Sequence, residues 1–432
     1  DEKAFLDMLT RLDFTPEKAD GGAYKVSLPK VPQPVYFRFA NKYLYAALSP
    51  ESVGKDQLLD PAAVLPADHV GALSVTVNLD QVPAKLKELA LTSAELRLAK
   101  YGKEKQPGET ERQRALRVAV LDQLARQYKE LLDEGGAVDA HLDVDRKAGE
   151  LALAVSLTAK PGSKLAGSLA DLGSAPSVAA ALPAAGTALR AAVNVALPES
   201  VRKALVPALD DGFRKALTKE TDADRRKALE GLFQALRPTL TAGALDAGFD
   251  VRGPEDKVYT MVSAVRIKDG SNVEKALRTV VKALPEGAEG FLGLKFDAEK
   301  AGAVAIHRLN PAARDEGTKR VFGEGAFYFA FRDDALFIAA GKDGLAALKE
   351  AAAAPPKAGP ALRAEVAMGP LAPLLAQQHK SAPEAAKEAF KGAGGDRVVV
   401  TLAGGKSLRL RATMKAPVIH FFALIQQAEK AE

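Results

Sequence analysis

Cysteine and tryptophan are absent from the 432-residue sequence. Without cysteine the chain has no disulfides, no thiolate nucleophile and no thiolate metal ligands. Long apolar runs are missing too: the longest, residues 418–425, is far shorter than the roughly 20 residues that a membrane-spanning helix needs. The 5 histidines lack the spacing of a zinc protease, and no Gly-x-Ser-x-Gly motif is present. The sequence thus favours a protein that is not an enzyme, has no cofactor and has no transmembrane segment.

What the chain does contain is typical of a folded globular protein. Apolar residues make up 47% of the sequence and charged residues 27%, which is too apolar for a disordered chain. The length is too great for one ordinary core and predicts two or three units. The formal net charge of +5 is small, and basic residues are interspersed with acidic ones. We therefore expect no nucleic-acid partner.

One stretch recurs three times along the chain. Residues 71–83 form a strand-like run that ends at a proline opening a helix, and altered forms follow at 188–198 and 361–370. Alternate side chains of a strand share one face of the sheet. The positions on that face that stay apolar are Leu73, Val77, Leu189, Val193, Leu362 and Val366. The pattern predicts that each copy is a core strand with this apolar face buried.

An aromatic hairpin also recurs, at residues 35–47 and 327–339. The matching pairs are Tyr36 and Tyr328, Phe37 and Phe329, Phe39 and Phe331, Leu44 and Leu336, and Ala47 and Ala339. A fixed order of such pieces indicates duplication of one supersecondary unit. We predict a first full repeat over 1–172, a truncated middle repeat over 173–270 and a second full repeat over 271–432. The predicted fold class is α+β, a two-layer arrangement of internally repeated, mainly antiparallel sheets, each covered on one face by helices.

One strand carries a cluster of potential metal ligands, which are Asp139, His141, Asp143 and Asp145. Their alternate spacing places all four on one face, and imidazole together with carboxylates can bind a divalent cation. The alternative is that they form the solvated face of a hairpin. The middle repeat favours this alternative, because its equivalent positions hold glycine in place of the histidine and arginine in place of the last acid.

The aromatic hairpins provide the other candidate site. A ligand or partner surface could be formed by Tyr36, Tyr43, Tyr45, Tyr328 and Phe337; the alternative is ordinary core packing, which suits aromatic residues in sheets. Four arginines lie on otherwise apolar strands, namely Arg190, Arg363, Arg409 and Arg411. We expect them to mark a solvated sheet face, with phosphate or acidic-polymer binding as the alternative.

The motif Leu65-Pro-Ala-Asp68, which leads into an alternating strand and a leucine-rich helix, resembles a family of uncharacterised exported bacterial proteins. The later run Ala335-Leu-Phe-Ile-Ala-Ala-Gly341 after an Asp-Asp turn is similar to the same family. The resemblance implies repeated strand–helix units behind a signal sequence. It implies no activity and no functional residue.

These features together predict an exported, non-catalytic protein of the cell envelope or the extracellular space. The chain begins without methionine, and a helical pattern starts at once, so we expect an extracytoplasmic location after removal of a signal peptide. The predicted role is structural or interactive, with self-association or an envelope partner through free sheet edges. The alternatives are a carrier of a lipid or another apolar ligand, and a hydrolase whose site is not visible in the sequence.

Overall fold

The structure is a computed structural model that describes residues 2–11, 14–27, 34–61, 72–104, 106–172, 175–285, 293–310, 315–391 and 395–431. It has two compact units, Asp1–Gly71 and Ala72–Glu432. Along the chain, helices and strands are interspersed, and the strands form two sheets in which every strand pair is antiparallel. The predicted α+β class is therefore confirmed. The Leu65-Pro-Ala-Asp68 motif lies outside the described residues.

The first unit is a small sheet with one helix. Its elements are α1 (Glu2–Arg11), β1 (Glu17–Ala19), the 3-10 turn Asp20–Gly22, β2 (Ala23–Val26), β3 (Val35–Ala40), β4 (Tyr43–Ala47) and the 3-10 turns Glu51–Val53 and Lys55–Gln57. The strands lie in the order β1-β2-β3-β4. Asn41 and Lys42 turn the predicted hairpin with positive φ angles of 52° and 66°, as a two-residue primed turn requires. One face buries Phe37 against Leu9 of α1.

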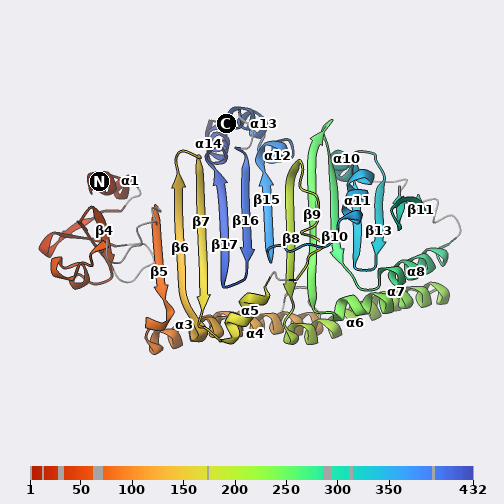
Figure 1. The fold of residues 1–432 in the computed structure, drawn as a ribbon, viewed down its shortest axis with the longest axis horizontal. Helices are drawn as coiled ribbons and strands as arrows, with labels where there is room; N and C mark the ends of the chain where they lie inside the picture. Colours follow the sequence, from red (N-terminus) through yellow and green to blue (C-terminus); the bar gives the residue numbers. More distant parts are fainter. Residues whose placement is uncertain are drawn as a thin grey trace. The chain divides into compact units, whose positions relative to one another are not determined.

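The second unit is built on one sheet of 13 strands. Its strands are β5 (Leu73–Asn78), β6 (Gly135–Asp145), β7 (Glu150–Ala159), β8 (Thr187–Ala196), β9 (Ala244–Glu255), β10 (Val258–Arg266), β11 (Leu294–Ala301), β12 (Val304–Leu309), β13 (Phe327–Arg332), β14 (Ala335–Ala340), β15 (Leu362–Ala367), β16 (Arg397–Ala403) and β17 (Ser407–Lys415). Their order in the sheet is β11-β12-β13-β14-β10-β9-β8-β15-β16-β17-β7-β6-β5 (Figure 1).

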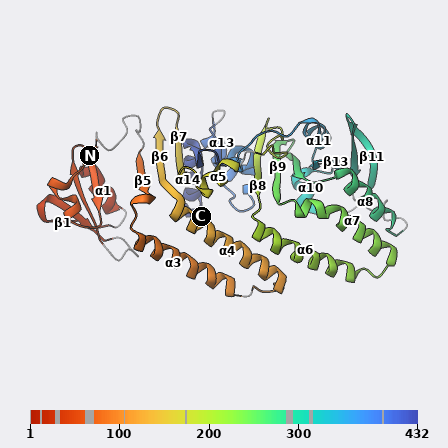
Figure 2. The ribbon, with the colours of Figure 1, turned by 60° about the horizontal axis from the view of Figure 1, so that its bottom comes forward.

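Helices connect these strands. They are α3 (Ala84–Lys103), α4 (Glu111–Glu134), α5 (Lys164–Asp171), α6 (Glu199–Lys219), α7 (Ala223–Thr241), α8 (Gly270–Lys282), α10 (Glu316–Phe322), α11 (Gly344–Ala353), α12 (Met368–Leu375), α13 (Ala382–Ala389) and α14 (Ala416–Ala431), with a 3-10 turn at Leu79–Gln81. The four longest, α3, α4, α6 and α7, lie along one end of the strands (Figure 2), and α12, α13 and α14 lie at the other end. None of the described helices is both long enough and apolar enough to cross a membrane.

A three-strand meander occurs three times, as β5-β6-β7, β8-β9-β10 and β15-β16-β17, and a pair of helices follows its first strand each time. Within the sheet, β8 pairs with β15 and β17 pairs with β7. Strands from all three predicted repeats, 1–172, 173–270 and 271–432, join the one large sheet. The boundaries of these repeats therefore differ from the boundaries of the two compact units. Unit 1 contains only the aromatic part of the first stretch.

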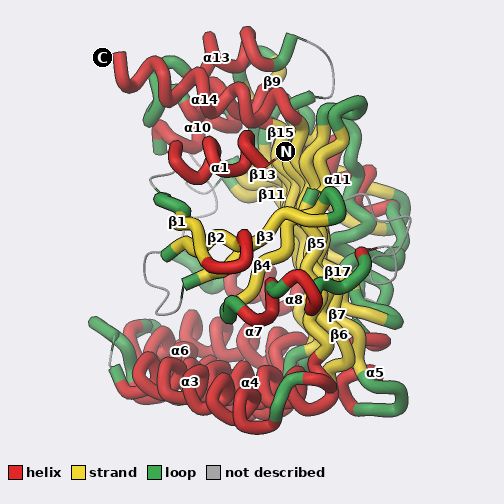
Figure 3. The backbone as a smooth tube through the Cα atoms, turned by 90° about the vertical axis from the view of Figure 1, so that its left-hand side faces the viewer, coloured by secondary structure: helices red, strands yellow, loops and turns green. Residues whose placement is uncertain are grey.

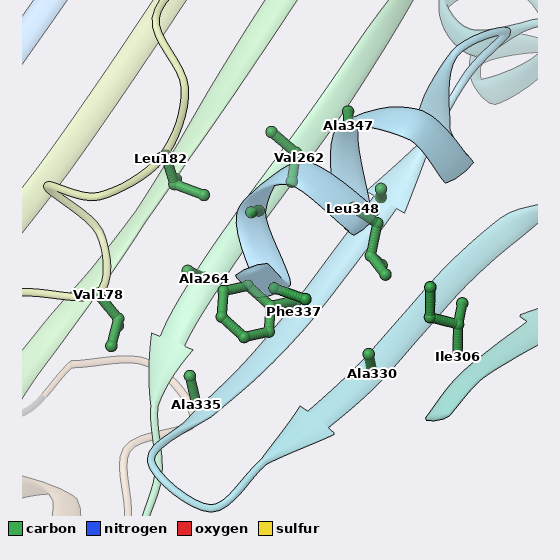
Figure 4. Close-up of a cluster of buried hydrophobic side chains, with 13 residues drawn as sticks. Val178, Leu182, Val262, Ala264, Ile306, Ala330, Ala335, Phe337, Ala347 and Leu348 are labelled. Carbon is green, nitrogen blue, oxygen red and sulfur yellow. The ribbon is translucent and has the colours of Figure 1, made fainter. Parts of the chain in front are cut away.

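The best-packed part of the second unit surrounds β10 to β14. On one face, Phe337 and Val262 pack against Leu348 of α11 (Figure 4). On the other face, Phe331 packs with Val273 of α8. Helices therefore cover this part of the sheet on both faces.

Candidate functional site: an open apolar sheet face

Strand register places a continuous row of apolar side chains across nine strands of the large sheet. Directly paired residues of neighbouring strands share a face. The row runs Val75, Ala140, Val155, Leu410, Leu402, Leu362, Val193, Ala247 and Val265. These nine strands run from β5 to β10 in sheet order and include β15, β16 and β17. We call the face that carries this row the open apolar face. With strands about 4.8 Å apart, it extends for roughly 40 Å.

The side chains of this face are incompletely covered. Leu73 is 57% exposed, Leu153 41% and Leu362 40%. The same holds toward β10, where Val265 is 38% exposed. The prediction that the apolar face of the repeated strand is buried is therefore wrong for Leu73, Val77 and Leu362. Helices contact this face near one end of the strands, where Leu157 packs with Leu165 of α5, and leave its middle open.

The opposite face carries polar side chains on β6, β17, β15, β8 and β9, and around β8 and β9 these are buried. Asp250 is 0% exposed, Asp246 2% and Arg190 7%. The arrangement reverses the usual one, in which a sheet buries its apolar face and solvates its polar face. Residues 175–186 form the cover, since Val178 and Leu182 lie in the same cluster as Phe337.

Hydrogen bonds satisfy the buried charges. Asp250 accepts from the Oγ1 of Thr187 at 2.6 Å and from the Nε of Arg190 at 2.9 Å. Arg190 also donates to the backbone carbonyl of Leu182 at 2.9 Å. The prediction that Arg190 marks a solvated face is therefore wrong, because its guanidinium ties the sheet to the covering segment. Arg411, which is 62% exposed in its side chain, does lie on a solvated part of the polar face.

A second buried carboxylate holds the same segment. Asp246 accepts from the Oγ of Ser177 at 2.7 Å and from the Nε of Arg266 at 2.9 Å. Gly248 lies between the two aspartates on β9. A Cβ there would come within 2.8 Å of the Ala179 Cβ and 2.7 Å of the Ala191 carbonyl oxygen, so glycine permits this close approach.

The predicted metal ligands of β6 do not converge on one point. Asp139 accepts from the Oγ1 of Thr76 at 2.8 Å, and the Nδ1 of His141 lies 2.9 Å from the Oγ of Ser74. Asp145 accepts from two backbone amides of the following turn. Asp143 is exposed. These four residues follow one strand on its polar face; the solvated face that the sequence favours for them stays a prediction, and metal binding stays its untested alternative.

The aromatic candidates separate into two environments. Phe337 is 1% exposed, which places its ring in the core and not on a ligand or partner surface, and Tyr328 packs against the same core cluster. In the first unit, Tyr43 is 47% exposed, Tyr36 is half-buried, and the hydroxyl of Tyr45 donates to the Leu59 carbonyl at 2.9 Å. The prediction of a surface is thus wrong for Phe337, and stays a prediction for the three tyrosines of the first unit.

Among the described residues, Glu274, Asp297 and His307 form a group whose potential ligand atoms lie within 4.8 Å of one another. Arg278 already supplies a cation there: its Nη2 donates to Glu274 and to Asp297, each at 2.6 Å. The Nδ1 of His307 accepts from the Asp297 amide at 3.1 Å. In a neutral imidazole the Nε2 then carries the proton and cannot ligate a metal. The geometry is that of an internal ion-pair network.

The first unit has a related contact between its helix and its second strand. The run Glu2-Lys3-Ala4 of α1 recurs as Glu274-Lys275-Ala276 of α8. Tyr24 pairs with Phe37 as His307 pairs with Phe329. The Tyr24 hydroxyl donates to Glu2 at 2.6 Å, so both copies join the helix to the second strand through a glutamate.

Burial lowers the pKa of His307, which is 0% exposed, below its ordinary value, although Glu274 and Asp297 oppose the shift. An unfolded histidine titrates near pH 6.5. Below that pH the unfolded chain binds a proton that folded His307 does not, so stability is lost as the pH falls. We expect His307→Gln to weaken the drop in urea midpoint between pH 7.5 and pH 5.5. An equal drop in the unmodified protein and in His307→Gln would contradict the assignment.

The long helices α6 and α7 enclose a small cavity. A cavity of about 120 Å³ lies between α6 and α7, lined by Phe213 and Phe233, and it is smaller than the roughly 300 Å³ at which small-molecule pockets begin.

No protein-family model, curated protein or solved structure matches the chain. The site therefore rests on its own geometry. Sequence reasoning named Val193 and Leu362 of this apolar row but missed its other members, although the alternation of each strand carried the signal. What could not be seen was that nine such strands adjoin in one sheet.

Proposed function

We propose that this protein is a non-catalytic carrier that holds a lipid, or another long apolar ligand, on its open apolar face. The observation that carries the proposal is the reversal of burial around β8 and β9, where Asp250 is 0% exposed while Leu245 on the same strand is 43% exposed. Folded proteins rarely leave apolar patches above a few hundred Å² uncovered unless a ligand or partner occupies them.

The chemistry of the face favours an acyl chain over a protein partner. Protein interfaces combine apolar contact with about one hydrogen bond per 100–200 Å². The row from Val75 to Val265 offers no polar side chain, and ladder pairing occupies the backbone of the inner strands. A hydrocarbon chain needs no hydrogen bonds, and each buried CH₂ group contributes about 0.8 kcal/mol.

The shape of the second unit also disfavours a second sheet as the occupant. Two sheets pack about 10 Å apart, face to face. Figure 3 shows that the helices at the two ends of the strands, α3, α4 and α6 at one end and α13 and α14 at the other, project to the same side of the sheet. They project from the side of the open apolar face, since α4, α7 and α8 contribute to the clusters that contain Leu157 and Phe331. Flexible chains fit between such helices more readily than a broad sheet.

A binding measurement with parinaric acid, a fluorescent long-chain fatty acid, tests the proposal. We expect delipidated protein to bind it, and Leu153→Asp to weaken binding roughly tenfold or more, because a carboxylate in the centre of the face must be desolvated against the acyl chain. Leu153 lies on the open apolar face and is 41% exposed. Native mass spectrometry of freshly purified protein should show a co-purified ligand.

The matched control is Ala154→Asp, one residue along the same strand and on the polar face. Ala154 pairs with Arg411, so the new carboxylate gains a cation as neighbour and binding should be unchanged. Absence of binding by the unmodified protein, or equal loss in the two variants, would overturn the proposal. The exported location and the scaffold role remain predictions of the sequence.

A further inference from the structure

The large sheet ends at β5, whose outer edge pairs with no strand among the described residues. All six residues of β5, Leu-Ser-Val-Thr-Val-Asn, are exposed. The strand has no charge, no proline and no break in its register with β6. Natural sheets usually protect an edge strand with a charged residue, a proline or a bulge that breaks the register. The edge at β11 does so, with a shift of register between Lys295 and Glu299 and several charged side chains.

The strands of the internal repeat that are equivalent to β5 show how their outer edges pair. β5, β8 and β15 are the first strands of the three meanders, and their inner neighbours are β6, β9 and β16 respectively. The outer edge of β8 and the outer edge of β15 pair with each other, antiparallel. β5 presents the third copy of that edge, and it has no such partner in the described chain.

The register of the β8–β15 pair is self-complementary when it is transferred to β5. In that pair Ala364 lies opposite Ala191, and both residues are equivalent to Val75 of β5. Leu362 lies opposite Val193; their equivalents in β5 are Leu73 and Val77. Applied to two copies of β5, this register places Val75 opposite Val75 of a second copy and Leu73 opposite its Val77. Such a pair has two-fold symmetry, as an isologous dimer requires.

We propose that two copies of the chain associate through β5, antiparallel and centred on Val75, so that the two large sheets become continuous. Ser74 then lies opposite Thr76 of the second copy, and no like charges meet across the pair. The helices that follow β8 and β15, α6 and α12, lie at opposite ends of their strands (Figure 1), so the same pairing of two β5 strands would place the two copies of α3 at opposite ends of the joined strands. The inference goes beyond the carrier proposal, since it concerns the edge of the sheet and holds whatever occupies its open apolar face.

Disulfide cross-linking tests the register directly, because the chain contains no cysteine. Directly opposite residues of an antiparallel pair lie about 4.5–5.5 Å apart at Cα, within the range of a disulfide. We expect Val75→Cys to form a covalent dimer under mild oxidation. Ser74→Cys alone should not, because its counterpart in the second copy lies diagonally, about 7–8 Å away. A mixture of Ser74→Cys and Thr76→Cys chains should cross-link.

Sedimentation velocity without oxidant supplies the second measurement. The unmodified chain should sediment as a dimer at micromolar concentration, and Val75→Lys should sediment as a monomer with an unchanged circular dichroism spectrum, because two ammonium groups would then face each other. A monomer at high concentration would overturn the proposal. So would equal cross-linking of Val75→Cys and Ser74→Cys, since that would indicate random collision and no fixed register.

Discussion

Arg190→Met is expected to destabilise the second unit by about 3–5 kcal/mol, the usual cost of leaving one member of a buried ion pair without its partner. Asp250 is 0% exposed and would lose its bond from the Arg190 Nε at 2.9 Å. Thr187 and Arg252 would still donate to it, and because Arg252 is a cation, the loss should fall at the lower end of that range. The measurement is the free energy of unfolding in urea at pH 7.

The control for Arg190→Met is Arg411→Met on the solvated part of the polar face. Arg411 is 62% exposed in its side chain, and its Nη2 lies 3.7 Å from Glu150; such surface pairs are worth about 0–1 kcal/mol. The double variant Arg190→Met with Asp250→Leu should recover only part of the lost stability: it removes the buried carboxylate that Arg190 had neutralised, but it also takes the acceptor from Thr187 and Arg252. Equal losses in Arg190→Met and Arg411→Met would contradict the buried ion pair.

The elements of the fold were largely predictable from sequence. Apolar alternation located the strands, and Asn41 with Lys42 located a hairpin turn that the structure confirms. Local pattern was less reliable for burial: Leu73 and Leu362, which alternation assigned to a buried face, are 57% and 40% exposed.

The face of the sheet that is buried could not be predicted from the alternation. The sequence shows that Leu189 and Arg190 lie on opposite faces, and ordinary energetics favours burial of the leucine. The covering segment reverses this preference, because its carbonyls and Ser177 accept or donate the hydrogen bonds that Arg190 and Asp246 need. These partners are 8 and 69 residues away in sequence, a separation that no local pattern reveals.

The ion-pair network around His307 was missed for a related reason. The Glu-Lys-Ala run shared by α1 and α8 was visible in the sequence, but the contact between Glu274 and His307 depends on the packing of α8 against the sheet. Repeat comparison could have found it, since Tyr24 and Glu2 mark the same contact in the first unit. The free edge of β5 required the order of the strands, which comes from the structure alone.

Phe337→Ala is expected to cost about 3–5 kcal/mol of unfolding free energy, as truncation of a buried aromatic side chain in a well-packed core usually does. The ring is 1% exposed and packs among Val262, Ala330 and Leu348 (Figure 4). Little collapse of the site is available, because α11 and the covering segment are both anchored to the sheet around it. Urea unfolding followed by circular dichroism gives the value.

The comparison variant is Leu362→Ala, a position that the sequence assigned to the core and the structure leaves 40% exposed. Its loss should be about 1 kcal/mol, because the side chain keeps much of its contact with water in the folded state. The expected difference between the two variants separates the closed core around Phe337 from the open apolar face. If Leu362→Ala lowered the unfolding free energy as much as Phe337→Ala does, the open apolar face would be covered in solution. Addition of parinaric acid should then leave the unfolding free energy of the unmodified protein unchanged. If the face is open, the same ligand should raise that stability, because it binds the folded state alone.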